Sequence, residues 1–245
     1  MKMGYDSLYY GSRLGYGYGY GFDPMYILVI IMAILCMVAS YRVSSVYKKY
    51  ARIRSMSGFT GAQAASEILR RNGITDVSVQ HVPGNLTDHY DPRSKTVCLS
   101  DATYGSQSVA AVGVAAHECG HVLQHYQGYL PLNIRTALVP AANIGSKAGI
   151  PILILGMFLS LRPLITIGIV VFSLAVLFQV VTLPVEFNAS RRALAMLGDY
   201  GILADDELVH TRKVLSAAAM TYVASAASAV VQLLRLVLLN GRRRD

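Results

Sequence analysis

Two histidines and a glutamate occur at a spacing that can bind a catalytic metal ion, in the stretch His117-Glu118-Cys119-Gly120-His121. On an α-helix, residues four apart lie on one face, so His117 and His121 can offer two imidazoles to one ion. Glu118 follows the first ligand, where its carboxylate can take a proton from a water molecule at that ion. These ligands suit Zn²⁺, which in enzymes takes a tetrahedral site with one open position. The pattern therefore predicts a zinc-dependent hydrolase.

A third protein ligand is expected, and the sequence offers few candidates for it. A metzincin-type site would need Gly and His at two positions after the motif, where this chain has Gln124 and Gln127. Downstream of the motif the only glutamates are Glu186 and Glu207, and Glu207 belongs to an acidic stretch typical of the first turn of a helix. His210 is an alternative, although two cations follow it closely. Glu186, at the foot of an apolar segment, is the predicted third ligand.

Three further groups have both a functional and an ordinary interpretation. Tyr222 is either a core tyrosine or a phenol that donates to the oxyanion of a tetrahedral intermediate. Cys119 lies on the other side of the helix from the first histidine, so it is predicted to pack rather than bind metal. His89, with Asp88 and Asp91, is predicted to lie in a solvated loop rather than in a metal cluster. An edge strand there, holding an extended substrate, is the functional alternative.

The composition indicates a membrane protein. Hydrophobic residues make up 53% of the 245 residues and charged residues 15%, with a mean hydropathy of +0.42, which is too apolar for a typical soluble domain. The net charge of +8 could suggest nucleic acid, but the basic residues crowd beside apolar segments, as in membrane proteins. The three scattered cysteines imply no disulfide framework. We therefore expect a lipid bilayer and no nucleic acid among the partners.

The N-terminal part is predicted to be a tail followed by a membrane anchor. Residues 1–23 are rich in Tyr and Gly and are expected to be disordered or to lie at the membrane interface. Residues 24–41 are predicted to form a transmembrane helix rather than a cleaved signal peptide. A basic cluster follows at once: Arg42, Lys48, Lys49, Arg52 and Arg54. This charge bias predicts that residues 42–138 lie in the cytoplasm, beneath the cell membrane.

The predicted cytoplasmic domain contains both helices and strands. Thr60 is predicted to begin a capping box at the start of a helix. Alternation of apolar and polar residues predicts one strand at 77–82, and a second short strand is predicted at 96–99. Ser100 and Asp101 are predicted to cap the helix that carries the metal motif.

The remainder is predicted to contain a membrane hairpin and the second half of the peptidase domain. Residues 139–185 form the predicted hairpin, and residues 186–245 the second half, with the third zinc ligand at its start. The apolar segment 214–239 is expected to pack against the catalytic core or the membrane face. As a fourth span it would export Arg242–Arg244 and bury Arg235, against the positive-inside rule.

Several of these features occur together, in one order, in a known family. They are the N-terminal span, the segment 86–92, the HExxH motif, the membrane hairpin and the run 186–190. In the order of these features, this chain resembles the bacterial YugP-type membrane zinc metallopeptidases. The resemblance covers about residues 23 to 239 of the chain. The chain is similar, more distantly, to HtpX-like peptidases, which typically have Asp where this chain has Ser190. The resemblance implies peptidase activity and zinc.

The sequence thus predicts a mainly α integral membrane protein with about three transmembrane helices, a small β element and a zincin (gluzincin-like) core. The predicted function is a zinc-dependent endopeptidase that hydrolyses protein or peptide substrates at the inner membrane surface. The main alternative is a non-catalytic zinc-binding adaptor, which would need a closed fourth ligand and would have no use for the base Glu118. A transporter is disfavoured because the spans carry few charges.

Overall fold

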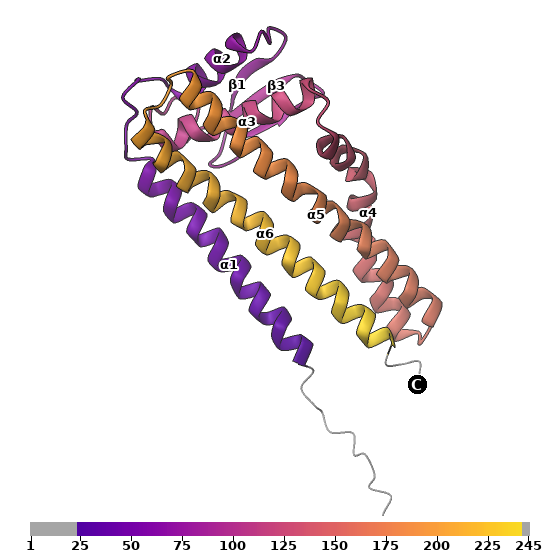
Figure 1. Cartoon of the computed structure of the whole chain (residues 1–245). Coiled ribbons are helices and arrows are strands. Elements are labelled where there is room, and N and C mark those ends of the chain that lie inside the picture. Colours follow the sequence, from indigo (N-terminus) through magenta and orange to yellow (C-terminus); the bar gives the residue numbers. More distant parts are fainter. Residues whose placement is uncertain (1–23, 242–245) are drawn as a thin grey trace, which may run out of the picture.

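The computed structural model describes residues 24–241, which form a mainly helical fold with one small sheet, as predicted (Figure 1). The helices are α1 (Pro24–Tyr50), α2 (Gly61–Arg71), α3 (Val109–Tyr126), α4 (Leu130–Phe158), α5 (Arg162–Asp199) and α6 (Asp205–Gly241). The strands are β1 (Ser78–Val82), β2 (His89–Asp91) and β3 (Thr96–Ser100). The tail 1–23 and the arginines of 242–245, with the predictions made for them, lie outside the described residues.

Four long helices form a bundle, and the shorter elements lie at one end of it (Figure 1). Helices α1, α6, α5 and α4 run side by side in that order, while α2, α3 and the sheet form a cap. The turn between α4 and α5 lies at the other end of the bundle, together with the start of α1 and the end of α6. The cap and the turn are thus separated by the length of the bundle.

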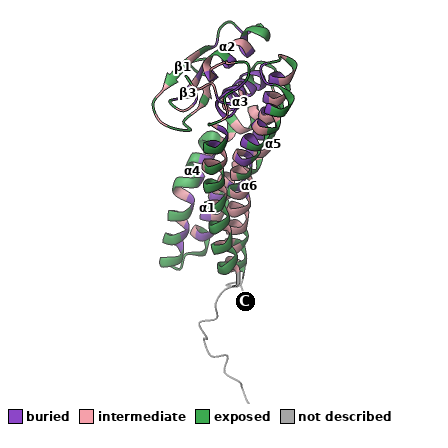
Figure 2. Ribbon diagram, turned by 90° about the vertical axis from the view of Figure 1, so that its left-hand side faces the viewer, coloured by how far each residue is buried: buried purple, intermediate pink, exposed green. Residues whose placement is uncertain are grey.

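Each bundle helix is long and apolar enough to cross a membrane, judged by length and composition. Few of their residues are buried in the isolated chain: exposed residues prevail on α1 and α4, and intermediate ones on the second half of α6 (Figure 2). Exposed apolar side chains include those of Leu155, Phe158 and Val170. Helix α6 adds a candidate span that the sequence did not predict. It runs antiparallel to α1, and the Arg235 guanidinium lies 5.2 Å from the centre of the Tyr26 ring. The described chain therefore has four candidate spans.

The first half of α6 also packs against the core of the cap. The Thr211 hydroxyl donates a hydrogen bond to the carbonyl of Val109 at 3.1 Å, although the two residues are far apart in the chain. A Cβ placed on Gly113 of α3 would lie only 2.4 Å from Cγ2 of Thr211, so the threonine side chain packs directly on the backbone of α3 at this glycine. Helix α6 is therefore fixed to the helix that carries the metal motif.

The predicted hairpin is formed by α4 and α5, which pack through glycines. A Cβ on Gly156 would lie 2.7 Å from the backbone nitrogen of Ile165, and a Cβ on Gly168 would lie 2.8 Å from that of Leu153. Small residues allow such close packing of helices in a membrane. Helix α5 continues without a break beyond the apolar segment to Asp199. The returning arm of the hairpin is thus the helix that carries Glu186.

The cap contains the predicted helix and both predicted strands. The capping box is present, with the Thr60 hydroxyl accepting from the amide of Gln63 at 3.2 Å. The sheet has the order β1-β3-β2, with β1 parallel and β2 antiparallel to β3. The prediction of a loop at His89–Asp91 is wrong, because these residues pair with β3 and place His89 opposite Cys98.

The predicted cap of the motif helix is also wrong. Helix α3 begins at Val109, and the Ser108 hydroxyl accepts from the amide of Ala111 at 3.2 Å. Ser100 instead ends β3 and donates from its hydroxyl to Asp88 at 3.0 Å. Asp101 holds the preceding loop, since its carboxylate accepts from the amide of Gly84 at 2.8 Å. Both residues are occupied by the sheet and its loops, and a turn separates them from the helix.

Candidate metal centre

His117 and His121 project from one face of α3, a helix that is largely buried. The small residues before the motif, Ala115 and Ala116, are fully buried, so the helix passes through the core of the cap. The two imidazole rings meet edge to face, with their centres 4.8 Å apart. Their side chains are only 16% and 12% exposed. The i, i+4 spacing thus brings both rings to one side of the helix, as predicted.

Glu186 reaches the same place because α3 and α5 approach closely at Gly120. A Cβ on Gly120 would lie 2.6 Å from the carbonyl oxygen of Ala189, so a larger residue would force the two backbones apart. Gly120 precedes His121, and Ala189 follows Glu186 by about one helical turn. The glycine of the motif is therefore what allows the two helices to share one site.

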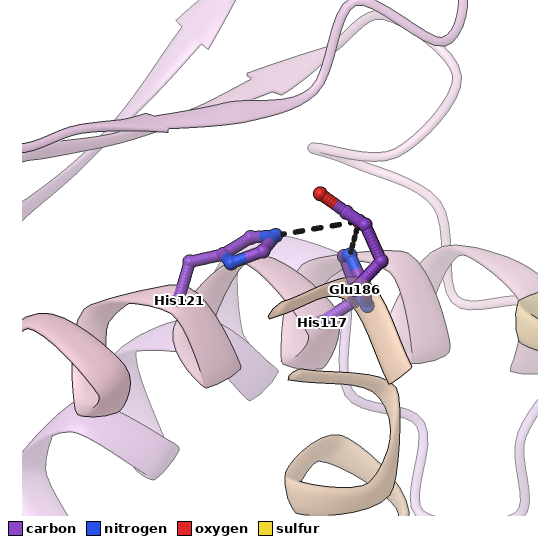
Figure 3. A group of neighbouring side chains, drawn as sticks. All are labelled: His117, His121 and Glu186. Carbon is purple, nitrogen blue, oxygen red and sulfur yellow. Dashed lines mark ion pairs between the residues drawn. The ribbon is translucent and has the colours of Figure 1, made fainter. Parts of the chain in front are cut away.

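The three predicted ligands converge on one point (Figure 3). Oε2 of Glu186 lies 3.3 Å from Nε2 of His117 and 3.7 Å from Nε2 of His121. Nitrogen and oxygen ligands of a tetrahedral zinc ion lie about 3.4 Å apart, which follows from bond lengths of about 2.1 Å. Oε2 of Glu186 is buried and has no hydrogen-bond partner among the described residues. The donor set and the orphaned oxygen both fit a bound cation.

The other imidazole nitrogens are held by polar side chains. Nδ1 of His121 lies 3.0 Å from Oε1 of Gln124, whose amide nitrogen donates to the Val185 carbonyl at 2.8 Å. Because that side chain is so oriented, Nδ1 of His121 must be the donor and Nε2 is left with a free lone pair. Nδ1 of His117 lies 3.2 Å from the Ser190 hydroxyl, which can play the same part. Both rings are thus oriented to bind metal through Nε2.

The electrostatics of the centre favour an added positive charge. Burial lowers the pKa of His121, but the carboxylates of Glu186 and Glu118, with the hydrogen bond to Gln124, together outweigh burial and hold that pKa above its usual range. A buried imidazole with a raised pKa lies in a negative potential. A divalent cation at the same point would be stabilised by the same carboxylates.

Glu118 and Tyr222 line the cavity beside these three residues. The cavity measures about 660 Å³ and lies between β2, α3, α4 and α5, with Tyr222 reaching it from α6. A second cavity of about 280 Å³ continues from the centre toward α1 and is lined by both residues as well. Glu118 is 7% exposed and does not belong to the group of three converging ligand atoms. The structure therefore places a carboxylate and a phenol next to the candidate metal position.

The alternative candidates lie elsewhere. Glu207 is buried, and its carboxylate accepts from the amides of Met56 at 2.7 Å and Ala204 at 2.9 Å. His210 stacks on the ring of Tyr50, with centres 5.0 Å apart. Neither belongs to the metal-binding group found among residues 24–241. Glu207 therefore ties α6 to the cap, and His210 packs against α1.

Cys119 packs in the core, as predicted. It is fully buried, its thiol lies 3.7 Å from the carbonyl oxygen of Ala65, and burial raises its pKa above the usual range. A thiol with a raised pKa stays protonated and is a poor ligand.

The residues around His89 form no metal cluster in the described part of the chain. Asp88 accepts hydrogen bonds from Ser100, and the Tyr90 hydroxyl lies 3.1 Å from Nδ1 of His125. His89 and Tyr90 face the larger cavity, so β2 forms one of its walls. The edge-strand alternative thus has the position it requires, beside the metal centre.

Sequence reasoning missed the residues that support the ligands. In the sequence Gln124 stands out only as a departure from a metzincin motif, yet it is fully buried between α3 and α5. Asn188 accepts from Gln124 at 3.0 Å and links it to Arg192. A usable signal was present, since Gln124 follows His121 by three residues on the same face of the helix.

Comparisons with known proteins agree with this geometry. A family described as "putative neutral zinc metallopeptidase" matches residues 25–241. A curated protein of Bacillus subtilis (strain 168), named "putative membrane protease YugP", is 47% identical over 207 residues, which cover 83% of this chain and 92% of the relative. No solved structure matches the chain significantly.

Proposed function

The chain belongs to the neutral zinc metallopeptidase family, and from that premise we propose that it is a membrane-embedded, zinc-dependent endopeptidase. It would hydrolyse peptide bonds of protein or peptide substrates at the inner membrane surface. The observation that carries the proposal is the meeting of Glu186 with His117 and His121, from two helices far apart in the chain. Three ligands and a neighbouring carboxylate are the donor set of a catalytic zinc site.

In this proposal, bound zinc would act as a Lewis acid toward the scissile carbonyl. Glu118 takes a proton from the attacking water and delivers it to the leaving amine, since its carboxylate lines the same cavity. The Tyr222 phenol donates a hydrogen bond to the oxyanion of the tetrahedral intermediate. Gln124 and Ser190 keep the imidazoles in the orientation that binding requires.

The proposed substrate path is the cavity between β2 and α4. Strand β2 pairs with β3 on one side only, and its residues line the cavity. An extended peptide can add to such a free strand edge by main-chain hydrogen bonds. With about 660 Å³, the cavity has room for several residues of substrate. The alternative of a non-catalytic zinc-binding adaptor is disfavoured, because among the described residues no fourth protein ligand joins the three.

Removal of the metal tests this function. We expect that purified protein in detergent micelles hydrolyses an unfolded protein substrate such as casein and loses this activity when zinc is chelated. Adding one equivalent of zinc should restore the activity, because the three ligands and their supporting hydrogen bonds are preformed. Hydrolysis that continues at the same rate in demonstrably zinc-free protein would contradict the proposal.

We also propose that the cap lies in the cytoplasm and the α4–α5 turn outside. The support is the basic cluster after the first span, together with the separation of cap and turn by the bundle (Figure 1). Single cysteines at the exposed positions Arg93 and Leu161 test this, on a background without native cysteines. In intact cells, an impermeant maleimide should label position 161 and not position 93. Labelling at position 93 and not at position 161 would show that the topology is the opposite of the one proposed.

A further inference from the structure

Among residues 24–241, Arg135 is the only lysine or arginine that lines the cavity beside the metal centre. It lies in the second turn of α4, and it lines this cavity together with residues of β2. Its Nε is buried and has no hydrogen-bond partner among the described residues. Within that part of the chain, no carboxylate forms an ion pair with it. The cavity thus contains a cation whose partner the described chain does not provide.

The guanidinium is held close to the catalytic groups. It lies over the ring of Phe178 of α5, 5.9 Å from the ring centre. It also lines the same cavity as Tyr222, Glu186 and Glu118. These contacts place Arg135 within reach of a peptide that lies across the metal centre. A surface arginine that merely extends into solvent would have neither a buried Nε nor these neighbours.

Each acidic residue of the cavity has either a contact or a proposed role of its own. Asp88 accepts from the amide and hydroxyl of Ser100 at 2.8 and 3.0 Å. Glu186 faces the two imidazoles, and Glu118 is the proposed base. A buried donor without a partner is unfavourable, and a cation in a candidate membrane helix is expected to pair with another group. A carboxylate that enters the cavity would supply the ion-pair partner that the described chain does not provide.

We propose that Arg135 binds a carboxylate of the peptide substrate, which makes it a residue that determines specificity. The inference rests on the proposed peptidase function and names a substrate class for it. The two Nη nitrogens of a guanidinium can bind both oxygens of a carboxylate, and this geometry favours a carboxylate over a neutral carbonyl. The carboxylate belongs either to the free C-terminus of the substrate or to an acidic side chain near the scissile bond.

Peptide binding to zinc-loaded Glu118→Gln protein in micelles tests the inference without turnover. Three pools of fluorescent decapeptides serve as probes. The first has free C-termini and no Asp or Glu, the second has amidated C-termini with Glu at random positions, and the third is amidated and has neither. Fluorescence polarisation should show binding of the first or second pool that is about 10- to 100-fold tighter than that of the third. The first pool indicates terminal recognition, and the second indicates side-chain recognition.

Substitutions on α4 assign this preference to Arg135. Arg135→Gln should abolish the preference, and Arg135→Lys should keep part of it, while zinc content stays unchanged in both. Lys147→Gln removes an exposed cation from the same helix and should keep the full preference. No preference in the parent protein, or an equal loss of binding for all three pools in Arg135→Gln, would overturn the inference.

Hydrolysis assays separate this inference from the proposed function. If the wild-type protein cleaves all three pools at equal rates, it is a peptidase but Arg135 selects no carboxylate. If it cleaves none of them while the carboxylate preference in binding persists, the anion site stands and the peptidase proposal fails.

Discussion

Replacing Glu186 by glutamine is expected to abolish hydrolysis and to weaken zinc binding by more than about 100-fold, because loss of a mere supporting partner already costs about 10- to 100-fold. Glutamine keeps the shape of the side chain, so the close packing of α5 on α3 should survive. What it removes is the anionic oxygen that faces His117 and His121 at 3.3 and 3.7 Å. The substitution should therefore lower the zinc content of the protein while the fold is retained.

Glu207→Gln is the matched control for Glu186→Gln. Glu207 is also a buried glutamate, 4% exposed, but its carboxylate accepts backbone hydrogen bonds at the start of α6. Its loss should lower the unfolding temperature and leave the zinc content near one per chain. Metal analysis by mass spectrometry and thermal unfolding of both variants measure the difference. A Glu186→Gln protein with full zinc and full turnover would show that the third ligand lies elsewhere.

The parts of the site that the sequence predicted are local. His117 and His121 are one helical turn apart, so their common face follows from helix geometry alone. The same holds for the capping box at Thr60, which joins residues three apart. Glu186 could be predicted as the third ligand only by elimination, because the residues around it do not indicate that α5 packs against α3. The family resemblance gave the order of the segments and left their packing to the structure.

The parts that the sequence missed depend on contacts between distant helices. Gln124 donates to the Val185 carbonyl across 61 positions, and Ser190 meets His117 across 73. No periodicity within either helix signals such a contact. Strand β2 has three residues and exists because β3 pairs with it, so alternation could not reveal it. The position of Arg135 in the cavity could not be predicted for the same reason, because its neighbours belong to α5 and α6.

Glu118→Gln is the other substitution with a large expected effect, and here zinc and activity should separate. The variant should keep its fold and one zinc per chain, because Glu118 is not among the three converging ligands. Hydrolysis should fall by about 10²- to 10⁴-fold, the contribution of a positioned general base. The amide of glutamine cannot take the proton from the attacking water or deliver it to the leaving amine.

His117→Ala completes this comparison, since it removes a ligand and should lose both zinc and hydrolysis. Metal content and the rate of cleavage of one substrate are measured for wild type, Glu118→Gln and His117→Ala. The three proteins distinguish a base from a ligand because only the base can be lost without the metal. If Glu118→Gln cleaved at the wild-type rate with full zinc, the proton must be taken by another group. Tyr222, which lines the same cavity, would be the next residue to replace.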